Sequence, residues 1–134
     1  MTNGRRTILA AALVLWSALA GAHVVQPLPV KFEFPDRDAV SVSVTYDEVV
    51  ALTHDKLPYT IEFWLAGALA KAGLKYSISR EHGHARITEI AGVGEGAHGE
   101  WIYYVNGIRS IYHINTQAAE DVHSIRFVFK PRAK

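Results

Sequence analysis

The stretch Trp101-Ile102-Tyr103-Tyr104-Val105-Asn106-Gly107 decides the fold predicted for this chain. Its first five residues are all β-branched or aromatic, and such residues favour a strand. Asn-Gly follows directly, and both central residues of a type I′ turn need a positive φ, which this dipeptide adopts readily. The sequence therefore predicts a tight β-hairpin, with the returning strand running from Ile108 to Ile114.

Other strands are expected on both sides of this hairpin. Apolar and polar residues alternate, as in half-buried strands, over residues 30–34, 40–46, 74–80, 86–90 and 125–130. Residues 47–59 follow no clear period and are expected to form a loop. The glycine-rich residues 91–99 are expected to form a mobile connection or a lid.

The clearest helical pattern covers residues 60–72. Its apolar residues recur on one face of a 3.6-residue period. Thr60 is the expected N-cap, and Gly73 is the expected residue after the last turn. Gly67 in mid-helix costs about 1 kcal/mol relative to alanine, so close packing on a sheet is its expected reason. The order β-β-α-β-β-β-β predicts an α+β fold, a mixed sheet with one covering helix.

Residues 1–22 have the features of a secretory signal peptide. Arg5 and Arg6 precede an apolar run at 7–19 that is shorter than the roughly 20 residues of a membrane span. Small residues allow cleavage before Gly21 or before His23. The arginine pair also leaves a twin-arginine export route open. We therefore expect a periplasmic or secreted protein with one domain at 23–134 and no stable membrane anchor after cleavage.

Composition excludes several classes of function. The chain has no cysteine, which excludes disulfide frameworks, thiolate metal sites and a cysteine nucleophile. Loss of Arg5 and Arg6 lowers Lys plus Arg from 14 to 12 against 13 Asp plus Glu, so the net charge becomes −1. No basic stripe then remains for nucleic acid. There is no Gly-x-Ser-x-Gly or His-Glu-x-x-His motif, and the carboxylates are scattered, so no enzymatic activity is expected.

The segment from Ile87 to Phe129 resembles the transcobalamin C-terminal-like family, a bacterial domain of the soluble-ligand-binding β-grasp group. The resemblance consists of the run 87–92, a glycine-rich stretch, the motif Trp-x-Tyr-Tyr-Val-Asn-Gly at 101–107 and a last strand after an acidic turn. It implies a β-grasp-like fold and a binding or surface role. Where the family usually has Gly-Asp, this chain has residues 121–124, Asp-Val-His-Ser. The resemblance therefore does not imply that this loop contacts a ligand, nor that the ligand is cobalamin.

The aromatic residues of the hairpin are the candidate ligand contacts. Alternation along a strand places Trp101 and Tyr103 on one face and Tyr104 on the other. One set is expected to pack under the helix, and the other to form exposed aromatic surface with Tyr112 or His113 across the hairpin. The candidate ligand-binding residues are Trp101, Tyr103, Tyr104, Asn106 and Tyr112. The expected function is non-catalytic binding of a small ligand or a cell-envelope partner, of unknown identity and with no cofactor specified.

Two alternatives stay open. The chain has seven histidines, and His82 and His84 flank a glycine, so both side chains could lie on one side of a turn. Imidazole ligates copper, and an N-terminal His23 could bind it through its amine and its ring, which would make the protein a periplasmic metal binder. The third class is a structural or assembly module that pairs through an exposed strand edge.

Overall fold

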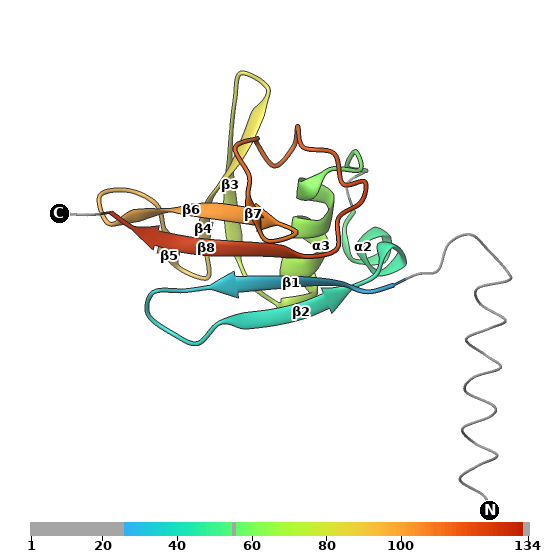
Figure 1. Ribbon diagram of the computed structural model, residues 1–134, viewed down its shortest axis with the longest axis horizontal. Helices are drawn as coiled ribbons and strands as arrows, with labels where there is room; N and C mark the ends of the chain where they lie inside the picture. Colours follow the sequence, from blue (N-terminus) through green and yellow to red (C-terminus); the bar gives the residue numbers. More distant parts are fainter. Residues whose placement is uncertain (1–25, 55, 133–134) are drawn as a thin grey trace, which may run out of the picture.

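The computed structural model describes residues 26–54 and 56–132. Within these ranges the chain forms two sheets and two helices, joined by turns and loops (Figure 1). The larger sheet has five strands, in the order β2 (Val40–Val44), β1 (Leu28–Glu33), β8 (Ile125–Pro131), β6 (Gly99–Val105) and β7 (Ile108–Arg109). The smaller sheet has three, in the order β3 (Tyr76–Glu81), β4 (His84–Ile90) and β5 (Val93–Gly94). The helices are α2 (Tyr46–Leu52) and α3 (Ile61–Ala72).

The predicted α+β class and the five predicted flanking strands are confirmed. The expectation of one covering helix is wrong, because α2 accompanies α3, and the strands divide between two sheets instead of forming one. The predicted signal peptide at 1–22 and His23 lie outside the described residues. Neither described helix has the length and hydrophobicity that crossing a membrane requires.

Strand β1 lies inside the five-stranded sheet. It pairs with β2 as an antiparallel hairpin and with β8 in parallel. The ring of Phe32 on β1 stacks on that of Phe127 on β8 with centroids 5.9 Å apart, and both side chains are fully buried. Helix α3 lies behind this sheet, and the β3–β4 hairpin runs across the direction of its strands (Figure 1). The hydrophobic core is therefore enclosed between the sheet, the helices and the second sheet.

The N-terminus of α3 is held by the backbone of a distant loop. Thr60 is the N-cap residue, as predicted, but its side chain makes no capping hydrogen bond. Instead, the N–H of Ile61 donates to the carbonyl of Gln117 at 3.1 Å, and the N–H of Glu62 donates to that of Ile114 at 2.8 Å. These carbonyls satisfy donors that a helix leaves unpaired in its first turn.

Helix α3 is buried along most of its length. Every residue from Ile61 to Leu69 is buried, including the carboxylate of Glu62, which is paired with Arg80 of β3. The apolar pattern in the sequence predicts burial of one face of this helix. In the structure more than one face is buried, because other elements cover it on several sides. At its other end Gly73 has φ 71°, and its left-handed conformation ends the helix as predicted.

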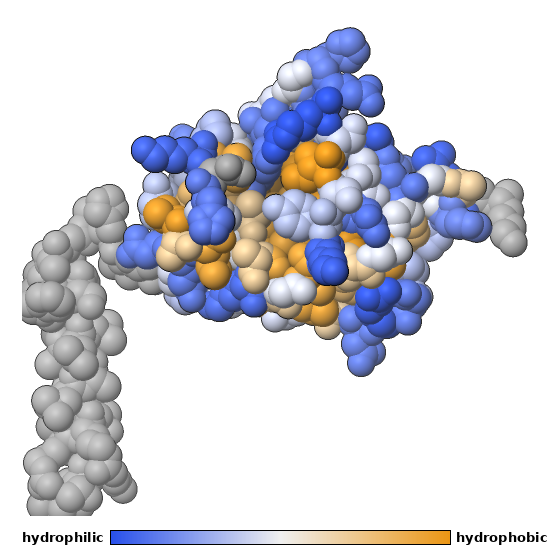
Figure 2. All heavy atoms as spheres, turned by 180° about the vertical axis from the view of Figure 1, so that it is seen from behind, coloured by the Kyte–Doolittle hydropathy of each residue, from blue (hydrophilic) through white to orange (hydrophobic). Residues whose placement is uncertain are grey.

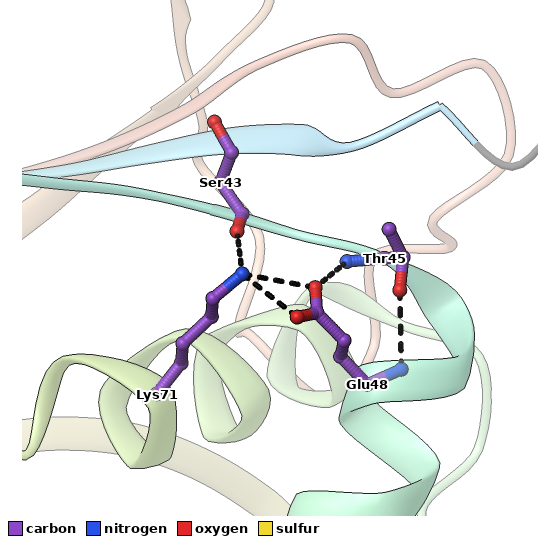
Figure 3. Close-up of polar contacts among 4 residues, drawn as sticks. All are labelled: Ser43, Thr45, Glu48 and Lys71. Carbon is purple, nitrogen blue, oxygen red and sulfur yellow. Dashed lines mark hydrogen bonds and ion pairs between the residues drawn. The ribbon is translucent and has the colours of Figure 1, made fainter.

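Helix α2 begins at Tyr46, which was expected to end the strand 40–46, and continues through residues expected to form a loop, so the loop expectation is wrong for 47–52. A capping box begins the helix: the hydroxyl of Thr45 accepts from the N–H of Glu48 at 3.2 Å, and the carboxylate of Glu48 accepts from the N–H of Thr45 at 2.8 Å. The ammonium of Lys71 on α3 binds both carboxylate oxygens of Glu48 and the carbonyl of Ser43, at 2.7–3.0 Å (Figure 3). These contacts join α2, α3 and β2.

Gly67 allows the two helices to pack closely. A Cβ built at this position would lie 2.4 Å from the side chain of Val49, which is itself fully buried. Close packing is therefore the reason for this glycine, as expected. Its partner, however, is helix α2 and not a sheet.

Gly67→Ala is expected to lower the free energy of unfolding by up to about 2 kcal/mol. Overpacking against Val49 costs about 1–3 kcal/mol, which exceeds the gain of about 1 kcal/mol in helix propensity. Urea denaturation of Gly67→Ala, Val49→Ala and the double variant measures the coupling between them. The double variant should be more stable than the sum of the single effects predicts, by about 1 kcal/mol. Additive effects would show that the two side chains do not compete for space.

Glu48→Gln should weaken the fold in a pH-dependent way. Lys71 and the Thr45 backbone hold the pKa of the Glu48 carboxyl below its usual 4.5. The stabilisation is therefore fully present above pH 4.5 and is lost as the pH falls through the lower pKa of the folded state. Glutamine can still form the capping box, so the substitution removes mainly the charge. Urea midpoints of wild type and variant should differ at about pH 7 and converge towards about pH 3.

Asp36→Asn is the matched control. The pKa of Asp36 is also lowered, by the adjacent Arg37. Because these residues are neighbours in sequence, much of their interaction persists in the unfolded chain. This variant should therefore change the urea midpoint little. A Glu48→Gln effect of the same size at both ends of the pH range would contradict the assignment to charge.

Candidate binding site

A pocket of about 460 Å³ lies beside the predicted hairpin. Residues 85–87 of β4 and 101–103 of β6 form two of its sides, and residues 109–114 form the third. We call it the hairpin pocket. Its volume falls within the range of small-molecule sites, roughly 300–1,000 Å³.

Trp101 and Tyr103 line the hairpin pocket from the core side. Their side chains share a face and are buried, as predicted for one set of the hairpin aromatics. The indole N–H of Trp101 donates to the carbonyl of Val93 at 2.8 Å. The ring of Tyr103 stacks on that of Phe127 with centroids 5.3 Å apart. Both rings therefore support the pocket and are part of the hydrophobic core.

The hydroxyl of Tyr103 ties β6 to the third side of the pocket. It lies 2.6 Å from the carbonyl of Tyr112 and 3.1 Å from the side-chain oxygen of Gln117. Burial raises the pKa of Tyr103 above its usual 10.0, against a smaller lowering by a hydrogen bond with Ser110. The phenol therefore stays protonated at neutral pH and acts as a donor.

Residues 110–114 do not continue the returning strand, so the expected strand at 108–114 is wrong beyond Arg109. Ser110 still donates its N–H to the carbonyl of Tyr103 at 2.9 Å. The chain then leaves the sheet edge, because Ile114 bonds to the N-terminus of α3. Ile111 and Tyr112, in the departing segment, are 86% and 60% exposed, and Ile108 on β7 is 73% exposed. No pattern in the sequence indicates that Ile111 is exposed.

Tyr104 lies on the opposite face of the sheet from Trp101. The guanidinium of Arg126 is 4.4 Å from the centre of its ring. Tyr104 lines a separate groove of about 350 Å³, together with Lys31 and Ser43. The structure thus brings Trp101, Tyr103 and Tyr112 to one pocket and places Tyr104 at another. Tyr112 does not join Tyr104 in one aromatic surface.

Asn106 forms the predicted turn and also holds a neighbouring loop. Asn106 and Gly107 have φ 53° and 83°, as a type I′ turn requires. The side-chain oxygen of Asn106 accepts from the N–H groups of His123 and Ser124 at 2.6 and 3.1 Å, and its amide donates to the carbonyl of Asp121 at 2.9 Å. Its polar atoms are therefore committed to the chain itself.

The β6 edge next to the pocket has unpaired backbone groups. The N–H of Asn106 donates to the carbonyl of Ser124, on the β8 side of β6. Backbone N–H groups alternate in direction along a strand, so those of Tyr104 and Ile102 point to the same side. Trp101 and Tyr103 therefore direct theirs the other way, towards β4. The carbonyl of Tyr103 accepts from the N–H of Ser110. Among the described residues, however, the N–H groups of Trp101 and Tyr103 have no partner on that side.

The pocket has more positive than negative groups. Its lining includes the guanidinium groups of Arg86 and Arg109, but no carboxylate among the described residues. Arg86 is paired with Glu95 at 2.6 Å. Arg109 is exposed and has no ion pair within residues 26–54 and 56–132.

The candidate metal ligands His82 and His84 lie at the β3–β4 turn. His82 and Gly83 have φ 53° and 80°, so this turn has the same geometry as the one at Asn106. The ring of His84 stacks on that of His113 at 4.2 Å, and with His82 they line a hollow of about 250 Å³. His113 is distant in sequence, so its position was not predicted. In the described ranges no three His, Asp or Glu side chains are grouped to hold a metal ion.

Asn106→Ala should lower the free energy of unfolding by about 2 kcal/mol, since it removes hydrogen bonds to three residues of the 121–124 loop. His82→Ala is the matched control, because His82 has the same φ and is also followed by glycine. It should cost less than about 1 kcal/mol. Chemical denaturation measures both. Equal losses of unfolding free energy in the two variants would show that Asn106 stabilises the protein only through its backbone conformation in the turn.

The comparisons with known proteins assign no family. No protein-family model matches the chain, and no curated protein matches it. The resemblance of residues 87–129 to transcobalamin C-terminal-like domains therefore stays a prediction from the residues themselves. The site is described from its own geometry.

Proposed function

We propose that this protein is an exported, non-catalytic binding protein that takes a small ligand in the hairpin pocket. The observation that carries the proposal is the exposure of Ile111 and Tyr112 beside a pocket of about 460 Å³. Scattered single apolar side chains are common on surfaces, but a group beside a concave site is typical of a binding surface. A bound ligand could cover both side chains.

The groups around the pocket support holding a ligand and not transforming it. Tyr103 and Trp101 are engaged in the core, and Asn106 is engaged with its own loop. The remaining lining is apolar apart from Ser110, Tyr112, His113 and the two arginines. Such a lining can bury an apolar body and orient one polar group.

The proposal includes a β-grasp-like fold. It is supported by the N-terminal β1–β2 hairpin, by the parallel pairing of β1 with the last strand and by a helix that packs on the same sheet. The binding role implied by the transcobalamin-like motif is consistent with this arrangement. Periplasmic or secreted location rests on residues 1–22 of the sequence.

The test uses two probes of similar size, 4-phenylbutyrate and 4-phenylbutan-1-ol, titrated into isotope-labelled protein. Chemical shifts should change at residues 85–87, 101–103 and 109–114. Mapping by residue is needed because apolar side chains also gather in the middle of the face behind the five-stranded sheet (Figure 2). Shift changes confined to residues outside these three segments would refute the proposed site.

Ile111→Ser and Tyr112→Ser are each expected to weaken binding of 4-phenylbutyrate about threefold or more, since each removes apolar contact area. Tyr76→Ser is the matched control. Tyr76 is 41% exposed on β3 and does not line the pocket. If all three variants bound the probe as wild type does, the hairpin would not be the binding surface.

A further inference from the structure

The hairpin pocket contains an unbalanced positive charge. Glu95 offsets Arg86, with 2.6 Å between the charged groups. Nothing comparable offsets Arg109 within the described residues, although Arg109 lines the same pocket. The guanidinium is a planar donor that suits two oxygens of one carboxylate or phosphate group. The pocket therefore favours an anion over a neutral molecule or a cation.

Backbone donors add to this preference. The N–H groups of Trp101 and Tyr103 face the pocket side of β6 and have no partner there among the described residues. They lie about 6.8 Å apart along the strand. On the facing edge of β4, the N–H of Ala85 is already bound to the side chain of Asn115 at 2.9 Å. The unused donors are therefore on the β6 side.

The remaining walls are apolar. Ile87 and Ile114 are buried at the pocket, and Ile111 lies exposed at the same site. An inorganic anion would leave these side chains without apolar contacts. A ligand that combines an apolar body with one anionic group can use both the isoleucines and Arg109. The volume, about 460 Å³, accommodates a ring or short alkyl chain together with a carboxylate.

We infer that the hairpin pocket is a site for small amphipathic carboxylates, with Arg109 binding the carboxylate and the isoleucines enclosing the apolar body. This inference rests on the proposed function and gives its ligand a chemical class. One of the two strand-edge N–H groups, that of Trp101 or that of Tyr103, orients the carboxylate, since donors about 6.8 Å apart cannot both bond to a single carboxylate. Arg109 is the residue that selects acids over alcohols and amines.

The experiment compares 4-phenylbutyrate, 4-phenylbutan-1-ol and 4-phenylbutylamine on the full mature chain by NMR titration. The acid should bind about tenfold more tightly than the alcohol, because a hydrogen bond to a charged group exceeds a neutral one. The amine should bind most weakly. Arg109→Gln should reduce the preference for the acid to less than about twofold, because it weakens binding of the acid far more than binding of the alcohol. Arg109→Lys should retain part of the preference, since it keeps the charge without the planar donor group.

Arg132→Gln is the matched control, because it removes one exposed positive charge that does not line the pocket. It should leave the preference intact. Equal binding of all three probes, or a preference that survives Arg109→Gln, would overturn the inference while leaving the proposed function standing. Failure of every probe to bind would instead overturn the proposed function. Loss of preference in both arginine variants would point to net charge and refute a specific role for Arg109.

Discussion

Two backbone hydrogen bonds at the start of α3 fix the segment that forms the third side of the hairpin pocket. The N–H groups of Ile61 and Glu62 donate to the carbonyls of Gln117 and Ile114. The N-terminus of a helix carries partial positive charge and unpaired donors, so it needs acceptors when buried. Here the acceptors belong to the segment that closes the hairpin pocket. The third side of the pocket is thus positioned by the helix that fills the core.

Residues of β6 likewise contribute both to the core and to the pocket. Its inward side chains, Trp101 and Tyr103, pack in the core, while the hydroxyl of Tyr103 fixes the segment around Tyr112. The pocket consequently has a rigid floor and a wall tied to it at both ends, by Ser110 and by Ile114. Such a site is preformed, which limits the conformational entropy lost when a ligand binds.

Features set by neighbouring residues could be predicted from the sequence, and those set by distant contacts could not. The turn at Asn106 and the helix end at Gly73 follow from local backbone preferences, and both are confirmed. The capping box of Thr45 with Glu48 is also local, and its spacing would have revealed α2. The exposure of Ile111 and the stacking of His84 on His113 depend on where the N-terminus of α3 binds the carbonyls of residues 114 and 117. No periodicity in the sequence carries that information.

The parallel pairing of β1 with β8 has a consequence for how the chain acquires its structure. The first and last described strands are neighbours, so the five-stranded sheet cannot close until β8, with Pro131 at its end, has been synthesised. Until then, the β1–β2 hairpin lacks the strand against which Phe32 packs. Contacts between residues far apart in sequence slow folding, because a long loop must close before they form. A growing chain of this topology therefore lacks its completed five-stranded sheet until β8 emerges.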